Sequence, residues 1–299
     1  MSLIRIVLLI SSTVGLLALG ALGFAGKPTA AIENETSDAP VLARRDILRT
    51  PPTIGPALNF AHRGASAYQA EHTLAAYRAA LTQGADFLEL DVHGSRDGKL
   101  VVVHDANLKR TAGADQAVRD LDLAEIRAIA PEIQTLEQVF AAFPGVPINI
   151  EIKQREPSIA AELARLIQSH KRESQVIVSS GSNAAIDEFR AASAGRVATG
   201  AALGEVLGVY GNYLIGRNLE HPLPFDALQI PYWTLAGIDL TTPEFIAYAH
   251  AQNLAVHFWT VDDPHEMERL IKSGADGIMT NRPDVLRDVL RRISIPEQP

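Results

Sequence analysis

Short runs of apolar residues alternate with longer amphipathic stretches from Ala57 to near the end of the chain. The runs are rich in Val, Ile, Leu and Phe, and a length of about 4–8 residues is typical of buried strands. They comprise Leu58–His62, Phe87–His93, Ile148–Lys153, Gln175–Ser180, Arg196–Ala201, Ala227–Pro231, Ala255–Val261 and Gly277–Thr280. The stretches between them have the apolar spacing of helices, as in Thr73–Gln83, Ile159–His170, Ala184–Ala192, Pro243–Gln252 and Pro264–Lys272.

This alternation predicts the class of fold. Eight strands that alternate with helices are the count of a (β/α)8 TIM barrel. An open, doubly wound sheet would show the same alternation, but no Gly-rich GxGxxG turn follows the first strand. We therefore expect an α/β protein whose TIM barrel spans residues 57–296.

One further run, Leu100–His104, does not fit the alternation. It follows the second strand after only Gly94–Lys99, which is too short for a parallel crossover, so it must return antiparallel as an added β-hairpin strand. The dipeptide Asp97-Gly98 is a strong signal for a two-residue hairpin turn. With that turn, His104 is expected to lie opposite Asp91.

Carboxylates recur on one face of two predicted strands. Glu89 and Asp91 of the second strand point to the same side because successive side chains alternate, and so do Glu151 and Lys153 of the third. Acids that meet inside a barrel repel one another unless a counter-charge is present. The pattern favours a divalent cation such as Ca²⁺ or Mg²⁺, which binds oxygen ligands. A buried salt-bridge cluster with Arg63 or Lys153 is the alternative.

His62 and Arg63 end the first predicted strand, and the carboxyl ends of TIM-barrel strands carry the active site. A histidine suits proton transfer near neutral pH, and an arginine can hold a phosphate through paired donors. His104 reaches the same region through the hairpin. The other histidines lack such convergence, and we expect them to be surface or paired core residues: His72, His93, His170, His221, His250, His257 and His265.

The chain opens with an apolar segment, Ile6–Gly26, that contains no charged residue. About 20 residues span a bilayer, whereas the apolar part of a cleaved signal usually has about 7–15. We therefore expect residues 1–26 to form a retained transmembrane helix that anchors the protein, with a cleaved secretion signal as the alternative. Residues 27–56 hold five prolines and predict a flexible linker. The catalytic part is expected outside the cytoplasm, in the periplasm or the extracellular space.

The overall charge limits the partners. The formal net charge of −8 argues against nucleic acid, whose binding surfaces are normally basic. A small anionic substrate remains compatible, because a bound divalent cation inverts the local charge of a site. The chain contains no cysteine, which excludes disulfides, thiol catalysis and cysteine-based zinc sites.

Many of these residues belong to longer motifs in a fixed order. They are Ala61-His62-Arg63-Gly64, Glu71-His72-Thr73-Leu74, Gly84-Ala85-Asp86, Glu89-Leu90-Asp91-Val92, Asp97-Gly98, Val103-His104-Asp105, Arg110-Thr111, Glu151-Ile152-Lys153, Trp259-Thr260-Val261 and the block from Gly274 to Pro283. From about Leu58 to Leu290 the chain resembles the glycerophosphodiester phosphodiesterases, a family of TIM-barrel phosphodiesterases similar to the phosphatidylinositol-specific phospholipases C.

The resemblance implies hydrolysis of glycerophosphodiesters to glycerol 3-phosphate and an alcohol. In such enzymes the neighbouring glycerol hydroxyl attacks phosphorus, and water then opens the cyclic phosphate. The implied roles are a divalent cation held by Glu89, Asp91 and Glu151, acid–base catalysis by His62 and His104, and substrate binding by Arg63, Lys153 and Trp259. The substrate is a small phosphodiester, and the membrane is a partner only through the N-terminal segment.

The chain departs from the usual family pattern at several motif positions. His72 and Asp262 each replace an asparagine, and Ala112 replaces a threonine. These changes bear on substrate preference rather than on the class of reaction. Two alternatives remain: lysophospholipase D-like hydrolysis of membrane lysophospholipids, and a catalytically silent barrel that only binds a headgroup. A silent barrel is expected to have lost an acid or a histidine, and this chain keeps all of them.

Overall fold

The computed structural model describes residues 46–49, 55–234 and 237–294 of the chain. Within these ranges eight parallel strands alternate with helices, as the sequence predicts. The strands are β1 (Leu58–Ala61), β2 (Phe87–Gly94), β4 (Ile148–Ile152), β5 (Val176–Ser179), β6 (Ala198–Thr199), β7 (Ala227–Pro231), β8 (Ala255–Trp259) and β9 (Gly277–Thr280). The predicted transmembrane helix of residues 1–26 and most of the predicted linker lie outside the described residues.

The parallel strands form a nearly closed barrel. Neighbouring strands pair in the order β6-β5-β4-β2-β1-β9-β8-β7, which leaves β6 and β7 at the two ends of the path. A parallel bridge between Gly200 and Ala227 joins these ends, supported by a hydrogen bond of 2.8 Å from the amide of Ala201 to the carbonyl of Ala227. The arrangement is that of a TIM barrel, so the carboxyl ends of all eight strands meet at one end.

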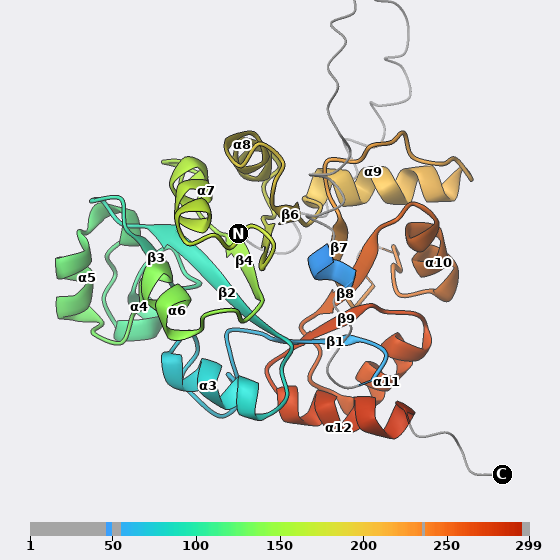
Figure 1. Ribbon diagram of the computed structural model, residues 1–299, viewed down its shortest axis with the longest axis horizontal. Helices are drawn as coiled ribbons and strands as arrows, with labels where there is room; N and C mark the ends of the chain where they lie inside the picture. Colours follow the sequence, from blue (N-terminus) through green and yellow to red (C-terminus); the bar gives the residue numbers. More distant parts are fainter. Residues whose placement is uncertain (1–45, 50–54, 235–236, 295–299) are drawn as a thin grey trace, which may run out of the picture.

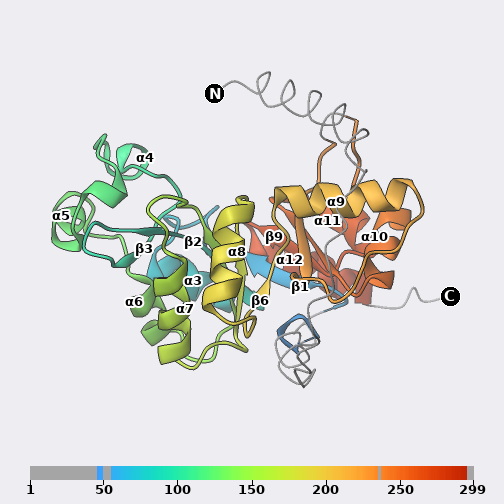
Figure 2. The same cartoon turned by 90° about the horizontal axis from the view of Figure 1, so that it is seen from above.

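Helices surround the barrel (Figures 1 and 2). They are α3 (Leu74–Thr82), α6 (Leu136–Ala142), α7 (Ala160–Ser169), α8 (Asn183–Ala192), α9 (Leu203–Leu214), α10 (Pro243–Ala251), α11 (Pro264–Lys272) and α12 (Pro283–Ser294). Several begin where a side-chain oxygen accepts a backbone N–H of the first turn, as Thr73, Thr242 and Asp263 do. The expected helix starts at Pro243 and Pro264 are confirmed.

The hairpin strand β3 (Leu100–Val102) pairs antiparallel with β2, as predicted, but in a register one residue away from the expected one. The turn has three residues rather than two: the amide of Ser95 donates to the carbonyl of Lys99, and Gly98 adopts φ 76°. A three-residue hairpin loop needs this left-handed residue at its end, a conformation that favours glycine. Val103, and not His104, therefore faces Asp91, and its amide donates to the Asp91 carbonyl over 3.1 Å.

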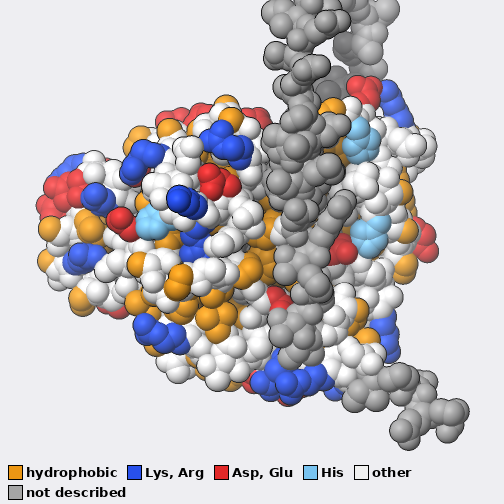
Figure 3. Space-filling view, viewed as in Figure 1, with side chains coloured by type: hydrophobic (Ala, Val, Ile, Leu, Met, Phe, Trp, Pro, Cys, Tyr) orange, Lys and Arg blue, Asp and Glu red, His pale blue; other side chains and the backbone are white. Residues whose placement is uncertain are grey.

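The hairpin opens an insertion that lies to one side of the barrel, at the left of Figures 1 and 2. It contains α4 (Lys109–Ala112), the 3-10 turn η2 (Val118–Asp120) and α5 (Leu123–Ile129). The insertion has a small apolar core of its own around Val103, Leu108 and Ile126. Over this half of the molecule, basic and acidic side chains lie among one another on the face drawn in Figure 3.

A short part of the predicted linker, residues 46–49, lies against the barrel. Asp46–Arg49 form a 3-10 turn, η1, in which Ile47 is buried together with Leu58, Phe60 and Phe87 of the barrel interior. Leu48 is partly buried against the same cluster, so the described residues of the predicted linker contact the barrel. No helix in the described ranges has the length and hydropathy needed to cross a membrane.

Candidate active site

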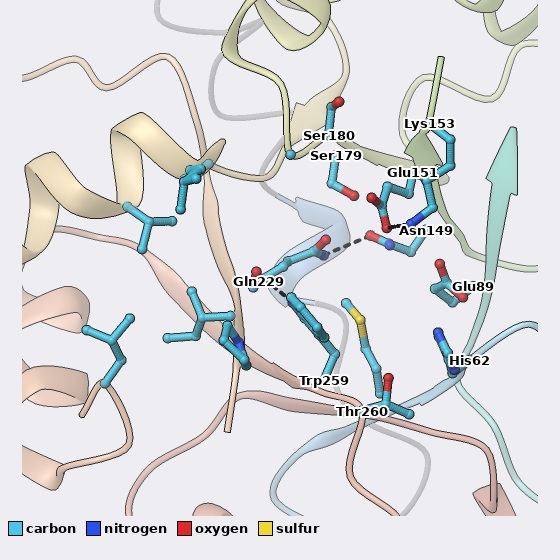
Figure 4. A pocket seen from close by; sticks show the side chains of 18 of the residues that line it. His62, Glu89, Asn149, Glu151, Lys153, Ser179, Ser180, Gln229, Trp259 and Thr260 are labelled. Atoms are coloured by element: carbon cyan, nitrogen blue, oxygen red, sulfur yellow. Dashed lines mark hydrogen bonds and ion pairs between the residues drawn. The ribbon is translucent and has the colours of Figure 1, made fainter. Parts of the chain in front are cut away.

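A cavity of about 420 Å³ opens at the carboxyl ends of the strands. Its polar end is lined by His62, Glu89, Glu151 and Lys153, whose side chains converge in the close-up of Figure 4. Arg63 and His104 line the same cavity. The barrel strands bring most of these residues together: His62 and Arg63 follow β1, Glu89 lies within β2, Glu151 lies near the end of β4, and Lys153 follows it.

Three carboxylates cluster at the polar end of the cavity, two of them lining it and Asp91 just behind. Glu89, Asp91 and Glu151 each offer an oxygen within 4.8 Å of the other two. The register pairs Asp91 of β2 directly with Glu151 of β4, and Glu89 lies two residues earlier on the same face of β2. Carboxylate oxygens are the ligands that Ca²⁺ and Mg²⁺ prefer, so the cluster suits a hard divalent cation.

Asp91 is already surrounded by cationic and donor groups. Arg63 Nε lies 3.3 Å and Lys153 Nζ 3.2 Å from its carboxylate, and His72 Nε2 lies 3.0 Å away. Burial raises the pKa of Asp91, but the hydrogen bond from His72 and the charges of His72, Lys153 and Arg63 hold that pKa well below its usual range. The sequence left two interpretations of the acids, a cation site and a buried salt-bridge cluster. Both apply in part, because Asp91 belongs to a salt-bridge cluster as well as to the acidic triad.

Glu89 differs from Asp91 in its surroundings. Its side chain is buried and accepts a hydrogen bond of 2.9 Å from the backbone amide of Arg63. Burial and the neighbouring charges of Asp91 and Glu151 raise the pKa of Glu89 well above its usual value. The charge of Lys153 and the hydrogen bond from Arg63 offset this only in part, and a bound cation would supply further positive charge. The donor set and its charge therefore fit the divalent cation that the sequence predicts.

The expectation that His72 is a surface or paired core residue is confirmed, and the structure adds that its partner is an acid of the triad. His72 is a buried residue with both ring nitrogens paired: one partner is Asp91 and the other is the hydroxyl of Tyr77, 3.0 Å from Nδ1. His72 adopts φ 63° in the loop after β1, which turns its side chain towards β2. The sequence pattern does not predict that this loop approaches β2. His93 is also buried, and its Nε2 lies 3.1 Å from the carbonyl of His104.

His62 follows β1 and is held through one ring nitrogen. Its Nδ1 lies 2.7 Å from Oδ1 of Asn281, which follows β9. Burial and the adjacent Arg63 lower the pKa of His62 to about 4. The imidazole is therefore neutral near pH 7, and its Nε2 is left for the cavity.

His104 is held by a carboxylate instead. Its Nδ1 lies 2.6 Å from Oδ1 of Asp105, and Asp105 is in turn bound by Arg110 Nε at 2.6 Å. Arg110 also donates to Glu71 over 2.6 Å, and Glu71 contacts Arg63. Asp105 and Arg110 thus orient His104 from the insertion. The register predicted from the hairpin turn placed His104 opposite Asp91 and so did not predict its contact with Asp105.

The opposite wall of the cavity is apolar. It is formed by Ala201, Leu203, Val206, Leu207, Ile230, Pro231, Trp233, Ile238, Leu240 and Trp259. Trp259 Nε1 donates to the carbonyl of Gln229 over 2.9 Å, so Trp259 presents its ring rather than a donor to the cavity. Its ring meets that of Trp233 edge to face at 5.4 Å. No sequence signal pointed to α9 or Trp233.

Of the eight residues predicted for the site, seven line the cavity: His62, Arg63, Glu89, His104, Glu151, Lys153 and Trp259. The eighth, Asp91, lies behind them with 1% of its surface exposed. Four further residues that contact the predicted site, directly or through one neighbour, lie within the same sequence motifs but had no predicted role: His72, Asp105, Arg110 and Asn281.

Comparison with known proteins identifies the family of the chain. Residues 62–285 match the model of the "Glycerophosphoryl diester phosphodiesterase family". The chain is 30% identical to a glycerophosphodiester phosphodiesterase of Caldanaerobacter subterraneus, over 79% of this chain and 98% of that protein. It is 31% identical to a probable glycerophosphodiester phosphodiesterase 2 of Mycobacterium tuberculosis, over 79% and 91% of the two chains. The lysophospholipase D GDPD1 of Rattus norvegicus is 29% identical, over 79% and 87%.

Solved structures show the same fold. The glycerophosphodiester phosphodiesterase of Thermotoga maritima superposes with a TM-score of 0.62 at 27% identity, covering 78% of this chain and 98% of that one. A phosphodiesterase of Oleispira antarctica, solved with sn-glycerol-3-phosphate, gives a TM-score of 0.61 at 23% identity, covering 79% and 96%. The chain belongs to the glycerophosphoryl diester phosphodiesterase family and is a phosphoric diester hydrolase that forms glycerol 3-phosphate and an alcohol from glycerophosphodiesters.

Proposed function

We propose that the reaction takes place at the polar end of the cavity and depends on a divalent cation, Ca²⁺ or Mg²⁺, held by Glu89, Asp91 and Glu151. The observation that carries this proposal is the convergence of the three acids within 4.8 Å, with the raised pKa of Glu89 among them. When bound, such a cation supplies Lewis-acid stabilisation of negative charge on the non-bridging phosphate oxygens.

Arg63 and Lys153 bind the phosphate in this proposal. Both line the cavity, and both are held next to the acids by Asp91. An arginine can donate two parallel hydrogen bonds to phosphate, whereas a lysine acts as a point charge. The two side chains therefore orient the diester and neutralise charge that develops on it.

His62 and His104 carry the protons. The neutral His62 accepts the proton of the neighbouring glycerol hydroxyl through Nε2 as that oxygen attacks phosphorus. His104, which Asp105 orients, acts as the acid and gives a proton to the oxygen of the departing alcohol. Water then attacks the cyclic phosphate and gives its proton to His104, and His62 returns its proton to the glycerol oxygen. Each histidine ends the cycle as it began.

A direct test is hydrolysis of glycerophosphocholine by the full-length protein, followed by ³¹P NMR with and without a chelator. We expect glycerol 3-phosphate to form only with Mg²⁺ or Ca²⁺ present. Glu89→Gln should lose cation affinity and turnover together, because the amide cannot supply the negative charge. Full activity after exhaustive chelation would contradict the proposed centre.

A second substrate class, the lysophospholipids, is favoured by the apolar wall. The side chains of Leu203 and Leu207 line the cavity yet are 54% and 38% exposed, so the wall continues to the surface. Every exposed residue from Leu203 to Gly216 is Leu, Ile or Gly. A single acyl chain can lie along this wall while the glycerophosphate occupies the polar end, and the likeness to a lysophospholipase D supports this candidate.

We also propose that residues 1–26 hold the protein at a membrane, with the barrel in the periplasm or the extracellular space. Support comes from the uncharged segment Ile6–Gly26 and from the apolar surface of α9. Determination of the N-terminal residue in the membrane fraction tests it. A retained Met1 or Ser2 supports the anchor, whereas an N-terminus after Gly23 shows a cleaved signal.

A further inference from the structure

Asn281 lies between His62 and a second acid, Asp262, at the carboxyl ends of β8 and β9. Its Oδ1 is 2.7 Å from Nδ1 of His62, and its Nδ2 is 2.6 Å from Oδ2 of Asp262. Ser66 Oγ also lies 2.7 Å from the same Oδ1. The mechanism proposed above uses His62 but assigns no role to either of these neighbours.

The chemistry of the groups fixes which way the amide of Asn281 points. A carboxylate only accepts hydrogen bonds, so the NH₂ group of Asn281 must face Asp262. The carbonyl oxygen then faces His62, and an oxygen accepts only from a nitrogen that carries a hydrogen. His62 must therefore carry its proton on Nδ1, which leaves the lone pair on Nε2 directed away from Asn281.

Asp262 is itself held firmly in this orientation. Its Oδ1 accepts from the backbone amide of Asn281 at 2.8 Å and from Thr280 Oγ1 at 2.9 Å. Thr280 Oγ1 in turn accepts from the backbone amide of Arg282 at 3.0 Å. With Oδ1 occupied by these donors, Oδ2 is presented to the side chain of Asn281.

We propose that Asp262 and Asn281 are positioning residues that fix the tautomer of His62, so that its Nε2 is ready to accept a proton from the substrate. Neither residue touches the reacting atoms in this arrangement. They act through the direction of two hydrogen bonds, in the way that a buried carboxylate orients the histidine of a hydrolytic triad.

The effect of exchanging the carboxylate for an amide follows from the same logic. In Asp262→Asn, Oδ1 of the new amide keeps its two donors, and its NH₂ group faces Asn281. Asn281 must then rotate to present its oxygen to residue 262 and its NH₂ group to His62. His62 Nδ1 becomes an acceptor, and the proton moves to Nε2, where it blocks the base.

The double exchange Asp262→Asn with Asn281→Asp restores the pattern. The amide at position 262 donates to the carboxylate at position 281, and that carboxylate accepts from His62 Nδ1–H as Asn281 does now. The total number of acids is unchanged. If Asp262 only stabilised the fold, adding Asn281→Asp would disturb a second contact and would not reverse the effect of Asp262→Asn.

The test is ¹⁵N NMR of the full-length protein labelled at histidine, since the chemical shifts of the two ring nitrogens distinguish the tautomers. The His62 signals are assigned from a His62→Gln sample. We expect the Nδ1–H form in the wild type, the Nε2–H form in Asp262→Asn, and the Nδ1–H form again in the double exchange. Thr280→Val removes one hydrogen bond of Asp262 without turning the amide, so it should keep the Nδ1–H form.

Turnover of glycerophosphocholine provides the second readout, and its use rests on the proposed role of His62. Asp262→Asn should lower kcat about 100-fold, within the usual range for loss of a positioned base, and leave KM nearly unchanged. The double exchange should recover most of that loss. An Nε2–H tautomer in the wild type overturns the proposal whether or not the variants fold. So does an unchanged tautomer in Asp262→Asn. A correct tautomer pattern without any change in kcat would instead refute His62 as the base.

Discussion

Nε2 of His72 lies 3.0 Å from Oδ2 of Asp91, and both side chains are buried. The hydroxyl of Tyr77 holds the other ring nitrogen of His72 at 3.0 Å. His72 therefore belongs to the support of the acidic cluster, although it does not line the cavity. Loss of this donor leaves a buried carboxylate with one partner fewer, which changes both the stability of the fold and the position of a cation ligand.

Replacement of His72 by alanine is expected to destabilise the protein by about 2 kcal/mol, the size of a lost hydrogen bond to a charged group, and to lower turnover more than tenfold. Tyr77→Phe keeps the contact between His72 and Asp91 and is the matched control, with a smaller effect on turnover. Thermal unfolding and kcat for the two variants provide the comparison. If His72→Ala stays within tenfold of the wild type and binds Mg²⁺ equally well, His72 does not support the site.

The raised pKa of Glu89 predicts how the stability of the cation-free protein depends on pH. Above the ordinary carboxyl pKa the unfolded chain releases the Glu89 proton, whereas the folded protein keeps it until its raised pKa is reached. The folded state binds more protons in that interval, so stability falls as pH rises.

Glu89→Gln removes this penalty. In the presence of a chelator, the gain in Tm of Glu89→Gln over the wild type should be larger at pH 8 than at pH 5. Added Mg²⁺ should stabilise the wild type more than the variant, since it binds the folded wild-type protein. An identical pH dependence of Tm in both proteins would show that Glu89 carries no uncompensated charge.

The apolar wall predicts a selective effect of α9 on substrates. Leu207→Ser should raise KM for lysophosphatidylcholine about tenfold, the loss expected when about two methylene groups, worth about 0.8 kcal/mol each, are no longer buried. The same variant should leave the kinetics with glycerophosphocholine unchanged, since that substrate has no acyl chain. Leu214→Ser is the control: this residue lies on the same helix, is 63% exposed and does not line the cavity. Equal effects of Leu207→Ser on both substrates would exclude the acyl-chain site.

The buried side chain of Ile47 predicts that residues before the barrel contribute to its stability. Ile47→Ala should destabilise the protein by about 2 kcal/mol, the lower end for loss of a buried isoleucine side chain. A chain truncated to begin at Thr53 lacks Ile47 and should unfold at a lower temperature than one that begins before Asp46. Equal Tm values for the two truncated proteins would show that Ile47 does not stabilise the barrel.

The sequence predicted the barrel because its strands are short apolar runs bounded by helix caps and turns, and these are local signals. β7, β9 and α11 begin and end where the sequence predicts. Local signals also placed Glu89 and Asp91 on one face of β2 and Glu151 on β4.

Contacts between distant segments had no such signal. The three-residue turn at Gly98 shifted His104 by one position, because the two turn types share the dipeptide Asp97-Gly98. His72 contacts Asp91, and Asn281 contacts His62, because loops after different strands fold over the end of the barrel. The pattern of strands in the sequence does not predict the conformation of these loops. The range of α9 was not predicted because its exposed positions are Leu and Gly, so it lacks the polar face by which an amphipathic helix is recognised.

The most direct test of the proposed chemistry is kcat for glycerophosphocholine in His62→Ala and His104→Ala, with Mg²⁺ binding measured on the same samples by calorimetry. Removal of a positioned acid or base should lower kcat by about 10²–10⁴-fold in each variant. Mg²⁺ affinity should stay within a few-fold of the wild type, because neither histidine belongs to the acidic triad. Wild-type turnover in either variant, or a loss of Mg²⁺ binding that accounts for the loss of turnover, would contradict the assignment of His62 and His104 as the proton-transfer pair.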